Sequence, residues 1–227
     1  MNFSIWNGLG RLLLVAVLYL WYQSIFVLPP DIHQGEVYRI IYLHVPAAFA
    51  SFALAFGLLG TSLYGLATKS PGSEFASKAV AEIGFLFTLL TLVTGSIWGK
   101  PTWGVWWTWD ARLTTTFILA VLYAGYLLLW SSLPPGLGRI KSTGILGILI
   151  AVDVPIIYKS VTWWRTLHQP PSMMREGGST MAPEILSHLI VSIVALTLVS
   201  LYLVWRRADN LKTEWMIEVK TLNQLGA

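Results

Sequence analysis

Six long runs of apolar residues restrict what this chain can fold into more than any other feature. They cover about residues 12–28, 40–67, 79–98, 113–133, 144–161 and 185–205. A helix needs about 20 mostly apolar residues to cross the roughly 30 Å hydrocarbon core of a bilayer. Charged residues make up only 11% of the 227 residues, which is low for a soluble domain. We therefore predict an all-α, polytopic membrane protein with six transmembrane helices in one integral membrane domain, residues 1–227.

The distribution of Lys and Arg indicates how these helices are oriented. An even number of spans places both termini on one side of the membrane. Nine of the 15 cations fall on that side: Arg11, Lys69, Lys78, Arg139, Lys141, Arg206, Arg207, Lys212 and Lys220. Since loops rich in Lys and Arg stay in the cytoplasm, we predict cytoplasmic termini. The segments 29–39, 99–112 and 162–184 then face outward, and we expect the functional residues there.

The middle outer segment and the residue before it are rich in tryptophan. Thirteen residues hold five indoles: Trp98, Trp103, Trp106, Trp107 and Trp109. Tryptophan is enriched at membrane interfaces without any ligand, so an aromatic belt is the alternative explanation. A belt needs few Trp per helix end, however, and does not account for the intervening Gly99, Pro101 and Gly104. Flat indole faces, with glycine allowing close backbone approach, favour a large planar apolar ligand such as a porphyrin.

A haem would also need cations for its propionates and axial ligands for its iron. Arg112, Lys100 and Arg39 lie on the predicted outer face and are the candidates to bind propionates. The chain has four histidines on or near that face: His33, His44, His168 and His188. Each one alone is more often a polar interfacial residue than a ligand. His44, at the outer end of the second span, and His168, just beyond the fifth, are the preferred axial pair.

The chain contains no cysteine. This excludes thiolate metal sites, iron–sulfur clusters and covalent haem attachment through a C-x-x-C-H motif. The string Gly95-Ser-Ile-Trp-Gly99-Lys100-Pro101 is too short between its glycines for a phosphate loop, and it has proline where Ser or Thr would bind magnesium. The sequence thus shows no ATPase motif, and any haem would be held non-covalently.

Four motifs carry a resemblance to a known family: Trp-Gly-x-Trp-Trp-x-Trp-Asp from Trp103, Tyr-Arg-Ile-Ile-Tyr-Leu-His-Val-Pro-Ala-Ala from Tyr38, Val-Thr-Gly-Ser-x-Trp-Gly-Lys-Pro from Val93, and Trp-Trp-x-Thr-Leu-His-Gln from Trp163. Together they resemble the tryptophan-rich (WWD) haem-handling proteins of cytochrome c maturation. The length and the six spans are similar to the haem exporter protein C (CcmC) family. The CcmF and CcsA-type relatives share the tryptophan-rich segment but have more helices.

The resemblance implies a haem carrier rather than an enzyme. In that family the segment from Trp98 to Asp110 is a haem-binding platform, and the positions matching His44 and His168 are axial ligands. It implies that haem b, as transient cargo, is presented at the periplasmic face of a bacterial inner membrane to the haem chaperone CcmE. The implied partners are the ABC transporter subunits CcmA and CcmB, the small subunit CcmD and the lipid bilayer, with no nucleic acid.

Two acidic residues and two other functions remain open from the sequence alone. Asp110 either caps the fourth helix or binds Arg112 or a backbone amide. Asp153, deep in the fifth span, either marks a functional site or satisfies backbone groups freed by Pro155. The alternative functions are a haem-binding redox subunit of the b-cytochrome type and a transmembrane haem permease. A redox subunit usually pairs histidines well inside its spans, whereas His44 and His168 are predicted near the outer surface.

Overall fold

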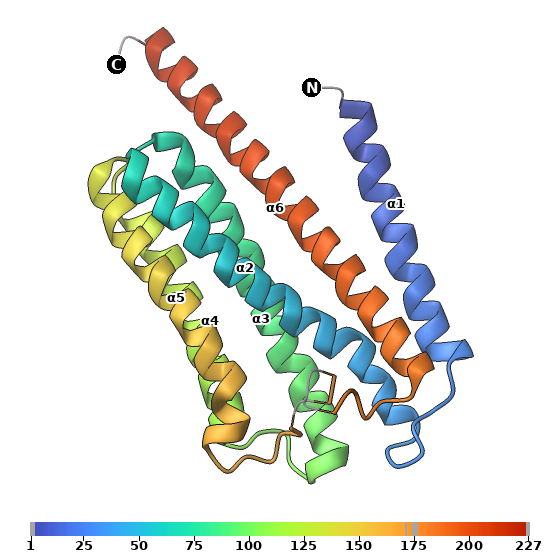
Figure 1. The fold of residues 1–227 in the computed structure, drawn as a ribbon. Coiled ribbons are helices and arrows are strands. Elements are labelled where there is room, and N and C mark those ends of the chain that lie inside the picture. The colour runs from blue at the N-terminus through green and yellow to red at the C-terminus, as the bar shows by residue number, and fades with distance from the viewer. Residues whose placement is uncertain (1–2, 171, 174–176, 226–227) are drawn as a thin grey trace.

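The computed structural model describes residues 3–170, 172–173 and 177–225. Within these residues six α-helices follow one another (Figure 1): α1 (Phe3–Tyr22), α2 (Ile41–Thr68), α3 (Pro71–Trp103), α4 (Ala111–Ser132), α5 (Leu137–Trp163) and α6 (Pro183–Leu225). A π-helical turn, η1 (Gln23–Val27), extends α1, and a 3-10 turn, η2 (Glu36–Ile40), leads into α2. The described residues form no strand beyond one isolated bridge between Asp31 and Gly35, which confirms the predicted all-α fold.

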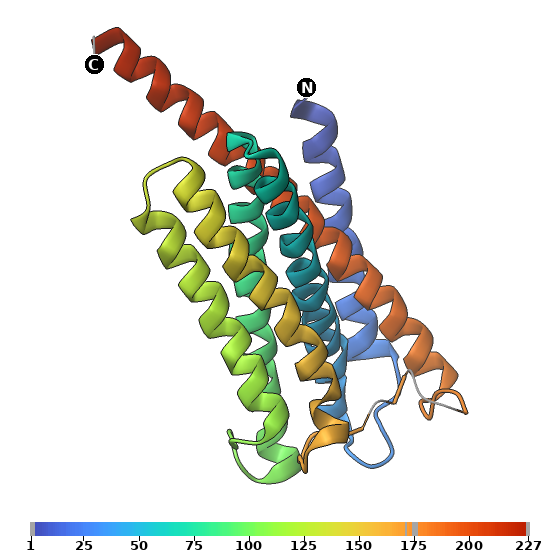
Figure 2. The ribbon, with the colours of Figure 1, turned by 60° about the vertical axis from the view of Figure 1, so that its left-hand side comes forward.

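Helix α2 lies at the centre of the bundle. It packs against α3, α5 and α6, while α4 packs against α3 and α5. Helix α1 contacts mainly α6 and lies at the edge (Figures 1 and 2). Both chain ends lie at one end of the bundle, which we call the terminal end. The connections α3–α4 and α5–α6 lie at the opposite end, which we call the tryptophan end.

The six α-helices are each long and apolar enough to cross a membrane, as predicted. Several extend beyond the apolar runs that predict them. Helix α3 covers Pro71–Trp103 where the run predicts 79–98, and α6 covers Pro183–Leu225 where the run predicts 185–205. Polar residues beyond an apolar run still adopt helical backbone, because helices propagate readily once formed. An apolar run therefore locates each helix but does not give its full length.

Small residues bring the helices close together. An added Cβ at Gly84 of α3 would lie 2.5 Å from the Tyr123 ring of α4, so this tyrosine packs directly on the α3 backbone. A Cβ at Gly147 of α5 would overlap the Ser62 hydroxyl of α2. Lipid tails are as apolar as Leu side chains, so helices in a membrane associate through close packing of this kind.

Helix α3 ends later than the tryptophan-rich pattern predicts. Residues 98–103 form its last turns and not part of a loop, and Pro101 is accommodated within them. The helix stops at Gly104, whose φ of 79° is left-handed and whose N–H donates to the Lys100 carbonyl at 3.1 Å. As a result, Trp98 and Trp103 project from a helix. The connection to α4 carries the other three indoles: Trp106, Trp107 and Trp109.

Two ion pairs, one buried and one half-buried, join the helices toward the terminal end. Arg139 of α5 donates from Nε to Glu74 of α3 at 2.6 Å, and these side chains are 9% and 5% exposed. Arg207 of α6 donates from Nε to Glu82 of α3 at 2.5 Å. In each of these pairs the charge is neutralised by a partner from another helix.

Candidate functional site

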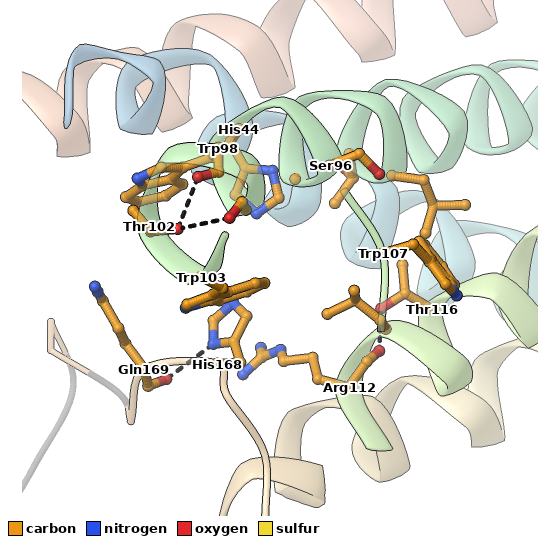
Figure 3. A pocket seen from close by; sticks show the side chains of 15 residues that line it. His44, Ser96, Trp98, Thr102, Trp103, Trp107, Arg112, Thr116, His168 and Gln169 are labelled. Atoms are coloured by element: carbon orange, nitrogen blue, oxygen red, sulfur yellow. Dashed lines mark hydrogen bonds between the residues drawn. The ribbon is translucent and has the colours of Figure 1, made fainter. Parts of the chain in front are cut away.

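Two adjoining cavities lie at the tryptophan end of the bundle. The first has about 690 Å³ of empty space, including its opening, and lies mainly between α3 and α4 (Figure 3). The second has about 820 Å³ and lies between α2, α5 and α6. The residues that line both cavities are His44, Trp98, Arg112, His168 and Gln169. The two predicted ligands thus stand at the wall that the cavities share.

His44 lies in the first turn of α2 with a defined tautomer. Its Nδ1 is 3.0 Å from the Thr94 hydroxyl oxygen of α3. That hydroxyl has a closer acceptor of its own in the Leu90 carbonyl at 2.7 Å, so its oxygen is placed to accept from His44. Nδ1 therefore carries the proton, and Nε2 keeps a free lone pair. An added Cβ at Gly95 would lie 3.0 Å from His44 Cε1, so this glycine makes room for the ring.

His168 lies in the connection between α5 and α6 and has the same tautomer. Its Nδ1 is 2.9 Å from the Gln169 carbonyl oxygen, which can only accept, so Nδ1 is protonated and Nε2 is free. The Trp103 ring lies beside it, with centroids 6.3 Å apart (Figure 3). Burial and the nearby Arg112 guanidinium lower the pKa of His168 from 6.5 to about 4. The ring is therefore neutral at physiological pH and available as a metal ligand.

Asp110 connects the tryptophan-rich segment to the segment that carries His168. One carboxylate oxygen accepts from the Leu113 N–H at 2.9 Å, which confirms the predicted N-cap of α4. The other accepts from the Thr166 hydroxyl at 2.8 Å and from the Leu167 N–H at 3.2 Å. Among the described residues Asp110 forms no ion pair with Arg112. Of the roles predicted for Asp110, the structure shows two: it caps α4 and it binds a backbone amide, that of Leu167.

The five tryptophans divide into two groups. Trp98, Trp103 and Trp107 line the first cavity. Trp106 and Trp109 line neither described cavity and are 58% and 72% exposed. Trp109 packs edge-on against Trp107, with centroids 5.5 Å apart, and thereby supports an indole that does line the cavity.

The three predicted cations differ in position. Arg112 lines both cavities and its side chain extends toward His168 (Figure 3). Arg39 lines neither cavity, because its guanidinium pairs with Glu36 and donates to the Ser24 and Leu28 carbonyls at 2.6 and 2.7 Å. Lys100 donates to the Gly104 carbonyl at 3.0 Å and closes the end of α3. Of these three cations, only Arg112 lies at the cavities.

The other two histidines lie apart from the cavities. His33 is exposed in the turn before η2. His188 of α6 is bonded through Nε2, which lies 2.9 Å from the Ser24 hydroxyl and 3.2 Å from the Leu20 carbonyl. Because the Ser24 hydroxyl donates to Leu20, it accepts from His188. The Nε2 of His188 is consequently protonated and has no lone pair for a metal.

Sequence reasoning does not identify several residues that shape the site. Thr94 and Gly95 fix His44, and both lie about one helical turn before Trp98, so helical spacing from that tryptophan could have found them. Thr166 lies two residues before His168 and bonds both Asp110 and the His168 N–H. No pattern in the sequence reveals that pairing, because it joins segments 56 residues apart.

Comparison with known proteins places this arrangement in a family. The profile of the family described as "Heme exporter protein C" (CcmC) matches residues 3–222. "Heme exporter protein C" of Bradyrhizobium diazoefficiens is 39% identical over 210 residues, covering 91% of this chain and 78% of the relative. The protein of the same name from Escherichia coli strain K12 is 39% identical over 206 residues, covering 91% and 82%. A "Putative cytochrome c biosynthesis ccmC-like mitochondrial protein" of Marchantia polymorpha is 47% identical over 161 residues, covering 70% and 67%.

Proposed function

Because this chain belongs to the heme exporter protein C (CcmC) family, we propose that it handles haem during the biogenesis of c-type cytochromes. As a single integral membrane domain, it binds haem b non-covalently at the periplasmic face of a bacterial inner membrane, with its termini in the cytoplasm. It delivers the haem to the chaperone CcmE within a complex that includes CcmA, CcmB and CcmD. The chain is a transfer subunit and performs no chemical step of its own.

The free Nε2 atoms of His44 and His168 are the observation that carries this proposal. Each histidine has its Nδ1 bonded to a fixed acceptor, the Thr94 hydroxyl or the Gln169 carbonyl. Such a bond orients a ligating imidazole and raises its basicity. Both rings line the two cavities. Two neutral imidazoles from different segments are a suitable axial pair for haem iron.

The remaining cavity residues supply binding surface and charge. Trp103 and Trp107 present indole area to the macrocycle, and each aromatic contact contributes roughly 0.5–1.5 kcal/mol beyond area burial. Arg112 is placed to bind a propionate, since a guanidinium binds carboxylates through paired hydrogen bonds. Without cysteine in the chain, no C-x-x-C-H attachment can form, so the haem stays transferable.

The depth of the histidines supports a surface carrier over a buried redox centre. His44 lies in the first turn of α2, eight residues after the helical segment begins at Glu36. His168 lies beyond the end of α5. Haem held between them would sit at the end of the bundle, within reach of a partner from the aqueous side, and not at mid-membrane.

The function is tested by loading the purified protein with haem in detergent and then adding the soluble domain of CcmE. We expect the wild type to bind haem and release it to CcmE, while His44→Ala and His168→Ala retain much less haem. His33→Ala is the matched control, because His33 is exposed and lines neither described cavity. A wild type that binds no haem despite ample supply would reject the proposal.

A second series tests the tryptophan platform. Trp103→Ala and Trp107→Ala should weaken haem binding by roughly two- to tenfold each, the equivalent of one aromatic contact. Trp106→Ala and Trp109→Ala should have smaller effects, because those indoles are largely exposed. If all four variants retain as much haem as the wild type, the tryptophans form a membrane-interface belt and not a haem platform.

A further inference from the structure

The segment that carries His168 has little packing of its own. Helix α5 ends at Trp163, and the following residues are irregular. Trp164 and Leu167 are each 52% exposed. Within 164–169, the Trp164 N–H donates to the Ser160 carbonyl of α5. The segment's hydrogen bonds to another part of the described fold are those that the Thr166 hydroxyl and the Leu167 N–H donate to Asp110.

Thr166 links Asp110 to His168. Its hydroxyl donates to Asp110 at 2.8 Å and accepts from the His168 N–H at 3.0 Å. The His168 ring is fixed in turn by its Nδ1 bond to the next carbonyl. A chain of hydrogen bonds therefore runs from Asp110 through Thr166 to His168.

We propose that Asp110 is the positioning residue for His168: its carboxylate holds this axial ligand to the tryptophan platform. The inference rests on the proposed haem function and adds a role for a residue that does not itself touch the iron. Asp110 begins α4 and follows Trp109 directly, so the platform and the ligand share one fixed point. A displacement of the α3–α4 connection would move His168 with it.

The hydrogen-bond chemistry explains why a carboxylate is needed at this position. All three partners of the Asp110 carboxylate are donors: the Leu113 N–H, the Thr166 hydroxyl and the Leu167 N–H. An ionised carboxylate only accepts and has enough lone pairs for all of them. An asparagine would keep one accepting oxygen for the helix cap, where Asn is as favourable as Asp. Its NH₂ group would then face the Leu167 N–H, and two donors cannot bond each other.

The bonds from Thr166 and Leu167 to Asp110 are called the tether below. Asp110→Asn therefore disrupts the tether while keeping the helix cap. We expect α4 to remain capped, haem to remain bound through His44, and the His168 bond to iron to be lost in much of the population. The ferric haem should shift from six-coordinate low-spin toward five-coordinate high-spin, and haem affinity should fall by about tenfold. Added imidazole should restore the low-spin spectrum, because it replaces the missing ligand.

Thr166 provides the matched pair of variants. Thr166→Val removes the hydroxyl at nearly constant volume and should reproduce the high-spin shift. Thr166→Ser keeps the hydroxyl and should resemble the wild type. Asp209→Asn, on the exposed face of α6, controls for the loss of a negative charge. A merely structural effect would lower the amount of folded protein without changing the spin state.

Hydrogen–deuterium exchange tests the tether without haem. The amides of Leu167 and His168 should exchange faster in Asp110→Asn and Thr166→Val than in the wild type and Thr166→Ser. Unchanged exchange together with an unchanged low-spin spectrum in Asp110→Asn would overturn the inference and leave the proposed function intact. Faster exchange in a protein that binds no haem would reject the proposed function and keep the tether as a structural fact.

Discussion

Replacing Thr94 with valine should weaken haem binding without unfolding the protein. The hydroxyl oxygen of Thr94 accepts from His44 Nδ1 at 3.0 Å, and Thr94 is only 4% exposed, so water cannot readily replace it. Without that acceptor, a protonated Nδ1 is buried unpaired, at a cost of roughly 1–3 kcal/mol. Otherwise the proton moves to Nε2, the nitrogen that should bind iron. Loss of such a supporting bond typically lowers metal affinity by about 10–100-fold, or roughly 1.4–2.7 kcal/mol.

A haem titration followed by the Soret band measures this effect. Thr94→Ser keeps an acceptor and should bind nearly as tightly as the wild type. Thr143→Val is the matched control, because Thr143 is also 4% exposed and its hydroxyl donates to its own helix, near the terminal end. Equal affinity in Thr94→Val and the wild type would refute the assignment of Nε2 of His44 as an iron ligand.

Three further predictions concern other parts of the structure. Gly95→Ala should displace the His44 ring, because the new Cβ would lie 3.0 Å from Cε1; a lower haem affinity by titration checks this, and an unchanged affinity would contradict it. Glu74→Gln should destabilise the protein by about 3–5 kcal/mol, since it leaves Arg139 buried without an opposite charge; thermal unfolding in detergent measures the loss, and replacing both residues with Met should recover most of it. Haem retention should be steady as the pH falls from about 8 to about 5 and should be lost only below about pH 4: the pKa of His168 in the folded protein lies at about 4, below its ordinary value of 6.5, and bound iron competes with the proton for the neutral ring. A drop centred near pH 6.5 would contradict the lowered pKa.

The sequence predicts the helices well, because each apolar run reports directly on the cost of placing residues in lipid. It predicts the ends of the helices less well. The run that ends at Trp98 stops before Lys100 and Pro101, yet α3 continues to Trp103 and ends at Gly104. The stop is a left-handed glycine, and only the backbone conformation distinguishes it from the other glycines nearby.

The candidate site shows a similar division. His44 and His168 are predicted as a pair because both lie at the predicted outer ends of two spans, and the structure brings them to one wall. The position of Arg39 could not be predicted in this way, because its partners include the backbone carbonyls of Ser24 in η1 and of Leu28 just after it. Asp153 is buried, with its Oδ2 unpaired in the described structure, and its place in α5 does not connect it to either cavity.

The electron paramagnetic resonance spectrum of the ferric haem complex tests the central claim most directly. Ligation by His44 and His168 predicts a low-spin signal of two imidazoles in the wild type. It also predicts a high-spin signal in both His44→Ala and His168→Ala, with low spin restored by added imidazole. A wild-type spectrum that is unchanged by both substitutions would show that the iron is held elsewhere and would contradict the account.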